Sequence, residues 1–261
     1  MELPLYQIDA FTNRRFGGNP AGVVPLRRWL TDKILQCIAF ENNLAETAFF
    51  MPEDDGYLLR WFTPTIEVDL CGHATLASAY VIANYLQPER REMRFETQSG
   101  RLTVTREGER FVLDFPLRPA RPVEAPAVGR ALGAEPHETL ASVQYLAVFE
   151  NWEQVANLKP DLAAVAALEL DGIIATAPGR GDVDYVARYF APGAGIPEDP
   201  ATGSAQCVLM PYWAGRLNRT RLRSRQISQR IGDFDCELAG NRVKISGQAV
   251  CYLRGSIFVD G

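Results

Sequence analysis

The stretch Tyr57–Tyr80, YLLRWFTPTIEVDLCGHATLASAY, indicates how the whole chain is organised, because its pattern occurs twice. Its first part reads Y-x-x-R-[WY]-F-x-P, and the same pattern returns at residues 185–192. Each copy leads to a glycine that opens a run of small and apolar residues, Gly72-His73-Ala74 in the first copy and Gly203-Ser204-Ala205 in the second. The second copy has three more residues between its proline and its glycine. A repeat at about half the chain length predicts two related lobes.

The small-residue runs predict a buried helix in each lobe. Residues 74–83 carry no charged side chain, and a helix that is apolar on all sides is stable only when protein surrounds it. We therefore expect an α+β fold in which the strands of each lobe wrap around one central helix. The second helix, expected over Ser204–Met210, should end near Pro211, since proline cannot continue the backbone hydrogen bonding of a helix.

A proline-rich connector at residues 116–126 predicts the boundary between the lobes. The expected N-terminal lobe comprises residues 1–116 together with a C-terminal strand at about 254–261. The expected C-terminal lobe comprises residues 117–253. The active site is expected in the cleft between them.

Composition limits the possible partners of the protein. The 261 residues are 47% hydrophobic and carry a net charge of −5, which fits a folded acidic protein. The densest basic stretch, Arg216–Arg230, is interpreted as a solvated face or a subunit contact, and no nucleic-acid partner is expected. No apolar run approaches the eighteen or so residues of a membrane span, so no membrane partner is expected either.

Cysteine usage and the N-terminal sequence indicate a cytoplasmic location. The five cysteines are an odd number with no C-x-x-C spacing, which is typical of reduced thiols. The first residues lack the basic and apolar regions of a signal peptide.

The sequence offers no cofactor motif. Walker and dinucleotide-binding fingerprints are absent, and so is the G-x-S-x-G motif of acyl-transfer enzymes. With only two histidines, a histidine-rich metal site is excluded, and no cluster of cysteine and carboxylate residues has metal-ligand spacing along the chain. We expect neither a cofactor nor a metal.

The two helix starts suggest a site for a small carboxylate substrate. Free backbone N–H groups and the positive end of the helix dipole favour an anion. Gly72 and Gly203 would let the ligand approach the backbone, and Asn19 lies in a glycine-rich loop that is either a ligand contact or an ordinary turn. Ser204 at the second helix start would line the same pocket or satisfy its own backbone.

The candidate groups for proton transfer are Glu46, His73 and Asp199, with Cys71 as a further candidate. Each has a structural alternative. Glu46 could be an exposed residue on an edge strand, and His73 could be a satisfied structural residue at a helix start. Asp199 could be a turn residue, because Asp-Pro is a common turn pair.

Together these segments resemble the PhzF (phenazine biosynthesis-like) family, which has the diaminopimelate epimerase-like fold. The matching pieces include Glu46-Thr47-Ala48-Phe49, Cys71-Gly72-His73-Ala74-Thr75 and Glu198-Asp199-Pro200-Ala201-Thr202-Gly203-Ser204. The resemblance implies two pseudo-symmetric lobes, each a mostly antiparallel barrel-like sheet around a central helix, a homodimer and no cofactor. It also implies catalysis by Glu46, assisted by His73 and Asp199, with Gly72, Gly203 and Ser204 lining the pocket.

One departure from the wider superfamily bears on the mechanism. The two-base epimerases of this fold place a cysteine before the glycine in both lobes, whereas here Cys71 precedes Gly72 but Thr202 precedes Gly203. The sequence therefore predicts an isomerase in which Glu46 takes a proton from a small carboxylate and returns it. The alternatives are a thiol-assisted amino-acid epimerase that uses Cys71, and a catalytically silent binding protein of the same fold.

Overall fold

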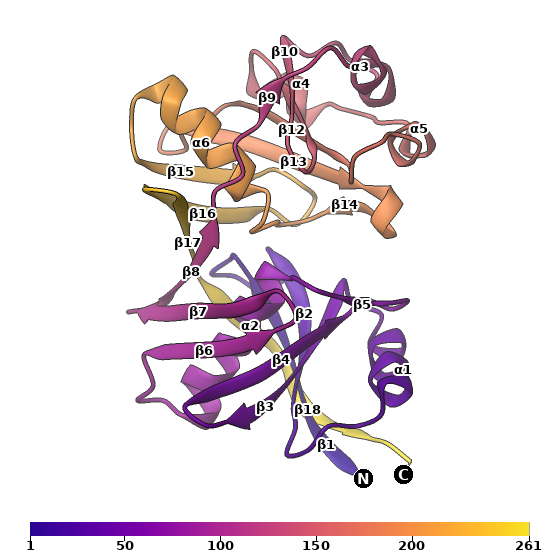
Figure 1. Ribbon diagram of the computed structural model, residues 1–261, viewed down its shortest axis with the longest axis vertical. Coiled ribbons are helices and arrows are strands. Elements are labelled where there is room, and N and C mark those ends of the chain that lie inside the picture. Colours follow the sequence, from indigo (N-terminus) through magenta and orange to yellow (C-terminus); the bar gives the residue numbers. More distant parts are fainter. Residues whose placement is uncertain (261) are drawn as a thin grey trace. The chain divides into compact units, whose positions relative to one another are not determined.

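A computed structural model describes residues 1–260, and the chain forms two compact units. The first unit comprises Met1–Asp114 and Ser246–Gly261, and the second comprises Phe115–Ile245. The boundaries expected from the sequence are residues 116 and 253, whereas the chain divides into these units after residues 114 and 245. Each unit is built from strands around a helix, so the fold belongs to the α+β class (Figure 1).

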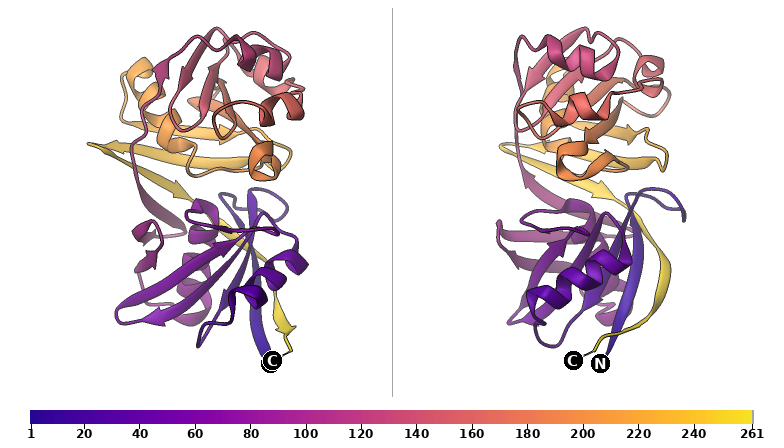
Figure 2. Two further views of the ribbon diagram at one scale, coloured as in Figure 1. Left: turned by 45° about the vertical axis from the view of Figure 1, so that its right-hand side comes forward. Right: turned by 90° about the vertical axis from the view of Figure 1, so that its right-hand side faces the viewer.

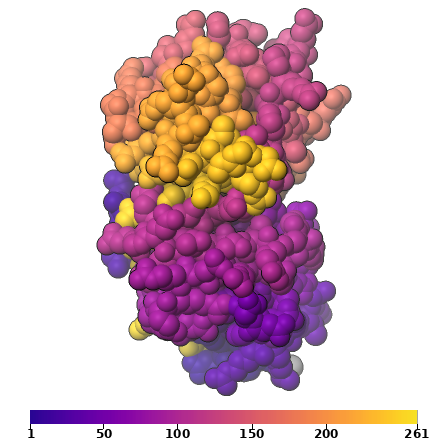
Figure 3. Space-filling model, turned by 60° about the vertical axis from the view of Figure 1, so that its left-hand side comes forward, coloured from indigo at the N-terminus to yellow at the C-terminus, as the bar shows by residue number. Residues whose placement is uncertain are grey.

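The first unit contains most of the N-terminal half of the chain and the C-terminal strand. In the space-filling view, the magenta segment that includes β6 and β7 forms much of the face of this unit that is turned to the viewer (Figure 3). Its elements are β1 (Glu2–Ala10), β2 (Asn19–Pro25), α1 (Asp32–Asn42), β3 (Glu46–Glu53), β4 (Gly56–Phe62), β5 (Glu67–Val68), α2 (Gly72–Val81), the π-helix η1 (Ile82–Leu86), β6 (Glu92–Thr97), β7 (Gly100–Glu107), β8 (Arg110–Pro116) and β18 (Ala249–Phe258).

The second unit repeats this order of strands, with two five-residue helices in the place of α1 and a longer central helix. Its elements are β9 (Arg121–Pro122), α3 (Pro126–Leu132), β10 (Glu138–Ala141), β11 (Tyr145–Val148), α4 (Trp152–Ala156), α5 (Leu162–Ala166), β12 (Ile173–Pro178), β13 (Tyr185–Ala191), the 3₁₀ turn η2 (Pro192–Ala194), β14 (Ile196–Asp199), α6 (Gln206–Leu217), β15 (Arg221–Gln226), β16 (Gly232–Ala239) and β17 (Arg242–Gly247).

The strand pairings of the two units match one for one. In the first unit β2 runs parallel to β3, β3 antiparallel to β4, and β4 parallel to β6. In the second unit the same three relations join β11 to β12, β12 to β13, and β13 to β15. The other printed pairings are antiparallel in both units. The repeat seen in the sequence is therefore a repeat of topology, and the predicted mostly antiparallel sheets are confirmed.

Helix α2 is enclosed by the sheet of the first unit (Figures 1 and 2). It packs against β1, β2, β3 and β18, and also against β7 farther along the sheet. Nine of its ten residues are buried, which confirms the prediction from the absence of charge. Its hydroxyl groups are satisfied within the helix, since Thr75 and Ser78 donate to the carbonyls of Cys71 and Ala74.

Helix α6 is the corresponding helix of the second unit. Its Trp213 stacks on Tyr185 of β13 with ring centroids 5.6 Å apart, and the Trp213 indole donates to Thr176 of β12 at 3.0 Å. Tyr185 in turn donates to Gln206 at the start of α6 at 2.8 Å. These buried contacts attach the helix to the strands around it.

The prediction that this helix ends near Pro211 is wrong, because α6 continues to Leu217 with Pro211 inside it. A proline has no N–H group, so the carbonyl of Cys207, four residues earlier, loses its helical donor. The backbone N–H of Arg118 donates to that carbonyl at 3.0 Å. A donor from the interlobe connector thus satisfies the carbonyl, and the helix does not have to end.

A bidentate ion pair in each unit confirms the alignment of the two halves. Arg60 donates to both carboxylate oxygens of Glu67 at 2.7 and 2.8 Å, and its guanidinium lies 5.1 Å from the Phe62 ring. The glutamate of the pair lies on β5, directly before the loop that leads to Gly72.

In the second unit Arg188 donates to both oxygens of Glu198 at 2.8 Å, and it lies 4.8 Å from the Phe190 ring. Glu198 precedes Gly203 by the same interval as Glu67 precedes Gly72. The extra residues of the second copy therefore lie before Glu198, and Thr202 and Ser204 are the counterparts of Cys71 and His73.

The strand register also identifies the counterpart of Glu46. Thr47 lies opposite Phe62 in the first unit, and Ile173 lies opposite Phe190 in the second. Glu46 therefore corresponds to Gly172, so the second unit has no acid at this position. Gly172 has a φ of +102°, and a Cβ atom there would lie 2.2 Å from the carbonyl oxygen of Phe190. Any side chain at this position would be strained and would clash with backbone.

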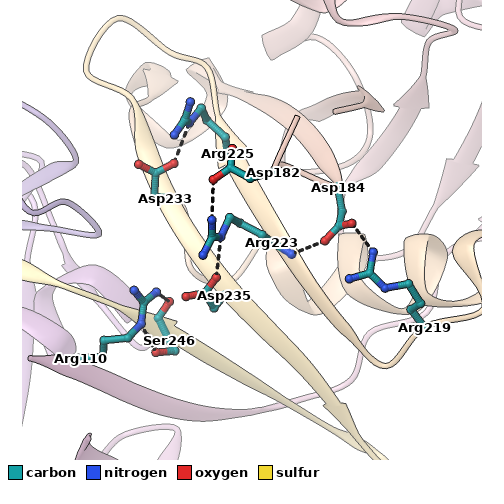
Figure 4. Close-up of polar contacts among 9 residues, drawn as sticks. All are labelled: Arg110, Asp182, Asp184, Arg219, Arg223, Arg225, Asp233, Asp235 and Ser246. Carbon is teal, nitrogen blue, oxygen red and sulfur yellow. Dashed lines mark hydrogen bonds and ion pairs between the residues drawn. The ribbon is translucent and has the colours of Figure 1, made fainter. Parts of the chain in front are cut away.

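The predicted basic stretch forms a charge-neutralised face on β15 and β16. Arg221, Arg223 and Arg225 lie directly opposite Glu237, Asp235 and Asp233 in the strand register, and each makes an ion pair with its opposite residue. Figure 4 shows that Arg223 also reaches Asp182, and that Asp184 holds Arg219. These carboxylates remove the net positive charge that attracts phosphates, which supports the expectation of no nucleic-acid partner.

Over residues 1–260, every helix is too short or too polar to cross a lipid bilayer.

Replacing Gly172 with alanine is expected to destabilise the protein by at least about 2 kcal/mol, because the new methyl group would clash at a left-handed backbone position. Urea unfolding of the variant measures this loss. The control is Gly215→Ala within α6, where a Cβ atom meets no atom within 4 Å and stability should be unchanged or higher by up to about 1 kcal/mol. Equal stability of the two variants would show that the backbone at Gly172 is not strained and has room for a side chain.

Candidate active site

Two parallel strands bring Asn19 and Glu46 to one edge of the first unit. Asn19 is the first residue of β2 and Glu46 is the first residue of β3, and the register pairs Ala21 with Glu46. Both side chains are buried, with Asn19 fully enclosed and Glu46 8% exposed. The reading of Glu46 as an exposed residue on an edge strand is therefore wrong.

The start of α2 supplies the next two groups. Cys71 is the residue before the helix, and Gly72 and His73 are its first two residues. All three are buried. The first turn of the helix places its backbone N–H groups and the positive end of the dipole at this edge, where the N–H of Ala74 faces the Cys71 sulfur.

The imidazole of His73 lies at the centre of this group. Its Nε2 atom is 3.1 Å from Oε2 of Glu46. Its Nδ1 atom faces the side-chain amide of Asn19 at 3.2 Å and the thiol sulfur of Cys71 at 3.5 Å. Within the described residues, His73 Nε2 and Glu46 Oε2 have no hydrogen-bond partner besides this mutual contact. The two atoms are thus placed to exchange a proton with a ligand.

The pKa values of this group follow from burial and from neighbouring charges. Burial raises the pKa of the Cys71 thiol to about 11, and the negative charge of Glu46 adds to this rise. Burial alone would lower the pKa of His73, but its contacts with Cys71 and Glu46 outweigh burial and place the pKa well above its usual value. Cys71 acts at Nδ1 and Glu46 at Nε2, so both ring nitrogens contribute to this rise.

The fold corrects one expectation from the sequence. Spacing along the chain shows no cluster of cysteine and carboxylate ligands, yet one potential ligand atom each of Glu46, Cys71 and His73 lies within 4.8 Å of the others. These are residue types that bind zinc. The two ring nitrogens of His73 face different members of the group, so a single ion held by all three residues would have to displace one of the observed contacts.

The second unit places Asp199, Gly203 and Ser204 in one turn. Asp199 ends β14 and is 7% exposed. Gly203 is buried and Ser204 is partly buried. The carbonyl of Gly203 accepts a hydrogen bond from the N–H of Gln206, three residues later, at 3.0 Å. The predicted helix start is therefore a turn with i to i+3 hydrogen bonding, and α6 itself begins at Gln206.

Two residues near Asp199 were not predicted as part of the site. The hydroxyl of Thr202 donates to Asp199 Oδ2, and the amide of Gln226 contacts Thr202 and the backbone carbonyl of Asp199. Thr202 stood out in the sequence only as the residue in place of a second cysteine. No sequence motif pointed to Gln226, because it reaches the turn from β15, more than twenty residues away in the sequence.

Comparison with known proteins gives a consistent result over the whole chain. The profile of the PhzC-PhzF family, described as phenazine biosynthesis-like protein, matches residues 8–255. An uncharacterised isomerase of Pseudomonas aeruginosa is 46% identical over 98% of this chain and 99% of its own length. The crystal structure of a PhzF-family protein from Enterococcus faecalis has a TM-score of 0.95 and 45% identity, and the match covers 99% of this chain and 100% of that chain.

A more distant structure shares the fold alone. A probable proline racemase from Agrobacterium radiobacter matches with a TM-score of 0.63 and 12% identity, over 99% of this chain and 93% of that one. The fold is thus that of the PhzF and diaminopimelate epimerase-like proteins, as expected from the sequence motifs.

Replacing Glu46 with glutamine is expected to lower the pKa of His73 by at least about one unit, because the carboxylate charge that stabilises the imidazolium is removed. NMR titration of the two imidazoles measures it, with the exposed His137 as an internal reference. The matched control is Glu53→Gln, at the exposed far end of the same strand. An unchanged titration of His73 in the Glu46 variant would show that the pair does not form.

The raised pKa of His73 also predicts a pH dependence of stability. The folded protein holds this proton more tightly than the unfolded chain, whose histidine has a pKa of about 6.5. The contribution is therefore complete below about pH 6.5 and is lost as the pH rises through the folded value. Glu46→Gln should reduce this dependence in urea unfolding measured between about pH 6 and 9, and Glu53→Gln should retain it.

Proposed function

Because the chain belongs to the phenazine biosynthesis-like PhzC-PhzF family and is an isomerase, we propose that it moves a proton within a small carboxylate substrate with Glu46 as the acid and base. The proposed reaction needs no cofactor. The substrate class we favour is an amino-acid-derived or cyclic acid. A homodimer and a cytoplasmic location stay predictions from the sequence.

The observation that carries the proposal is the contact of Glu46 with His73 at the start of α2. The two side chains are buried, and within residues 1–260 Oε2 of Glu46 and Nε2 of His73 have no polar partner other than each other, at 3.1 Å. Buried ionisable groups with a strongly shifted pKa, as His73 has here, occur preferentially at functional sites. A purely structural pair would be expected to have its remaining polar atoms satisfied.

The chemistry follows from the charges of the group. An ionised Glu46 can accept a proton from a carbon next to the substrate carboxyl group, and negative charge then develops on the carboxyl oxygens. The N–H groups and the dipole at the start of α2 would stabilise that charge. Glu46 would then return the same proton to another carbon, so that atoms and electrons balance without an oxidant or reductant. His73 would hold or shuttle the proton during this transfer.

The differences between the two units support a single principal base. Glu46 corresponds to Gly172, and Cys71 corresponds to Thr202, so neither group has a chemical equivalent in the second unit. Asp199 is the remaining buried acid near the second repeat glycine, and the prediction that it serves as a second proton-transfer group on the same substrate rests on the sequence motif.

The thiol alternative is less well supported by the structure. A thiol-based epimerase needs a thiolate, and burial keeps the pKa of Cys71 near 11, so at neutral pH nearly all of this residue is protonated. Its contact with His73 Nδ1 instead suits a role in holding the imidazole.

Incubation with candidate acids in deuterium oxide tests the proposal. A panel of amino acids and cyclic unsaturated carboxylic acids is followed by NMR for uptake of deuterium and for formation of an isomer. Glu46→Gln is expected to reduce the rate by about 10²- to 10⁴-fold, since general base catalysis contributes this much. Asp199→Asn should also lower it, and Cys71→Ser should stay within about tenfold of the wild type.

The control is Glu53→Gln, which should exchange at the wild-type rate. A Glu46→Gln variant with full activity would rule out the proposed base, and an inactive Cys71→Ser variant would favour the thiol mechanism. Thermal stabilisation by an acid from the panel, without any deuterium uptake, would favour a silent binding protein.

A further inference from the structure

The carboxyl group of Asp199 is held by a small buried network within the second unit. Thr202 is 6% exposed and Gln226 is fully buried. The Thr202 hydroxyl donates to Asp199 Oδ2. The Gln226 side chain contacts Thr202 twice, with Oε1 at 2.8 Å from its backbone nitrogen and Nε2 at 3.3 Å from its hydroxyl oxygen.

The direction of each proton in this network can be deduced. The backbone nitrogen of Thr202 can only donate, so the Gln226 atom that faces it must be the carbonyl oxygen Oε1. This fixes the amide orientation, and Nε2 must then donate to the Thr202 hydroxyl oxygen and to the backbone carbonyl of Asp199. A hydroxyl group has one proton, and the remaining contact of the Thr202 hydroxyl directs that proton to Asp199 Oδ2.

We propose that Thr202 and Gln226 are positioning residues that hold Asp199 as a hydrogen-bond acceptor, with the Thr202 hydroxyl donating to Oδ2. A donor to a carboxylate stabilises its charged form. The network therefore favours an ionised Asp199 that is ready to accept a proton. For catalysis, this inference rests on the proposed role of Asp199 in proton transfer.

The surrounding turn is built to keep this geometry. The Arg188–Glu198 ion pair fixes the residue directly before Asp199, and alternate residues of a strand point to opposite faces. The hydroxyl of Ser228 donates to the carbonyl of Pro200 at 2.6 Å. Gly232 lies so close to Ala201 that a Cβ atom would come within 2.4 Å of its methyl group. The turn is thus held from β14, β15 and β16.

The repeat gives a parallel at non-equivalent positions, since Asp199 aligns with Val68 and His73 aligns with Ser204. Thr202 is the counterpart of Cys71, and Cys71 contacts the imidazole of His73 in the first unit at 3.5 Å. In both units, the residue before the repeat glycine therefore contacts the titratable side chain of its own unit. The chemistry differs because a threonine hydroxyl is a stronger donor than a neutral thiol.

Carboxyl-carbon NMR of protein labelled at its aspartates tests the network without any substrate. The Asp199 signal is assigned from Asp199→Asn. Removing the hydroxyl with Thr202→Val or Thr202→Ala is expected to move the Asp199 titration to higher pH by about one unit, since a donor to the charged form is lost. The matched control Thr202→Ser keeps the hydroxyl and should titrate within a few tenths of a unit of the wild type. Gln226→Leu should give a smaller shift of the same sign.

The expected result is a large shift for Thr202→Val and Thr202→Ala, a smaller one for Gln226→Leu and almost none for Thr202→Ser. The part of the pH–rate profile that depends on Asp199 should move by the same amount. Wild-type titration in both Thr202→Val and Thr202→Ala would overturn the proposal, and so would a Thr202→Ser variant that behaves like Thr202→Val. The outcome is independent of the proposed reaction. If the titration shifts but no acid exchanges deuterium, the network is supported and the proposed reaction is ruled out. If deuterium exchanges but the titration does not shift, the proposed reaction is supported and the network is ruled out.

Discussion

A helix without a polar face can exist in water only where protein covers all its sides, and α2 imposes this requirement on the first unit. The sheet satisfies it by curling, so that β1, β2, β3, β18 and β7 all contact the helix. The same constraint places the residues at the start of the helix inside the protein. Burial of His73 and Glu46 is thus a consequence of the helix being enclosed. The raised pKa of His73 comes from its contacts with Cys71 and Glu46, which outweigh the effect of burial.

Duplication explains why the two units share one topology, and later divergence of their side chains explains why they carry different chemical groups. The ion pairs of Arg60 with Glu67 and of Arg188 with Glu198 hold equivalent strands in equivalent places. The chemical groups beside these strands have diverged. A glutamate in the first unit is replaced by a strained glycine, Gly172, in the second, where backbone occupies the space that a side chain would need. The asymmetry is therefore part of the backbone and cannot be reversed by a single substitution.

Polar groups near the repeat glycines are held by neighbours from distant parts of the chain. Asn19 and Cys71 face one nitrogen of His73, and Gln226 sets the direction of the Thr202 hydroxyl. Such contacts restrict which atoms carry protons. Proton transfer by Glu46 or Asp199 would depend on these restrictions as much as on the acids themselves.

The sequence by itself determined the α+β class, the duplication, the buried character of α2 and the family, because the spacing of aromatic, glycine and small residues is preserved in the linear chain. Only the tertiary structure decided that Glu46, Cys71 and His73 form one group, and that Gln226 belongs to the Asp199 turn. It also decided that α6 continues past Pro211, since the compensating donor is the backbone of Arg118, far away in sequence. These features depend on pairings between distant segments, and local patterns carry no information about which distant group will supply a hydrogen bond.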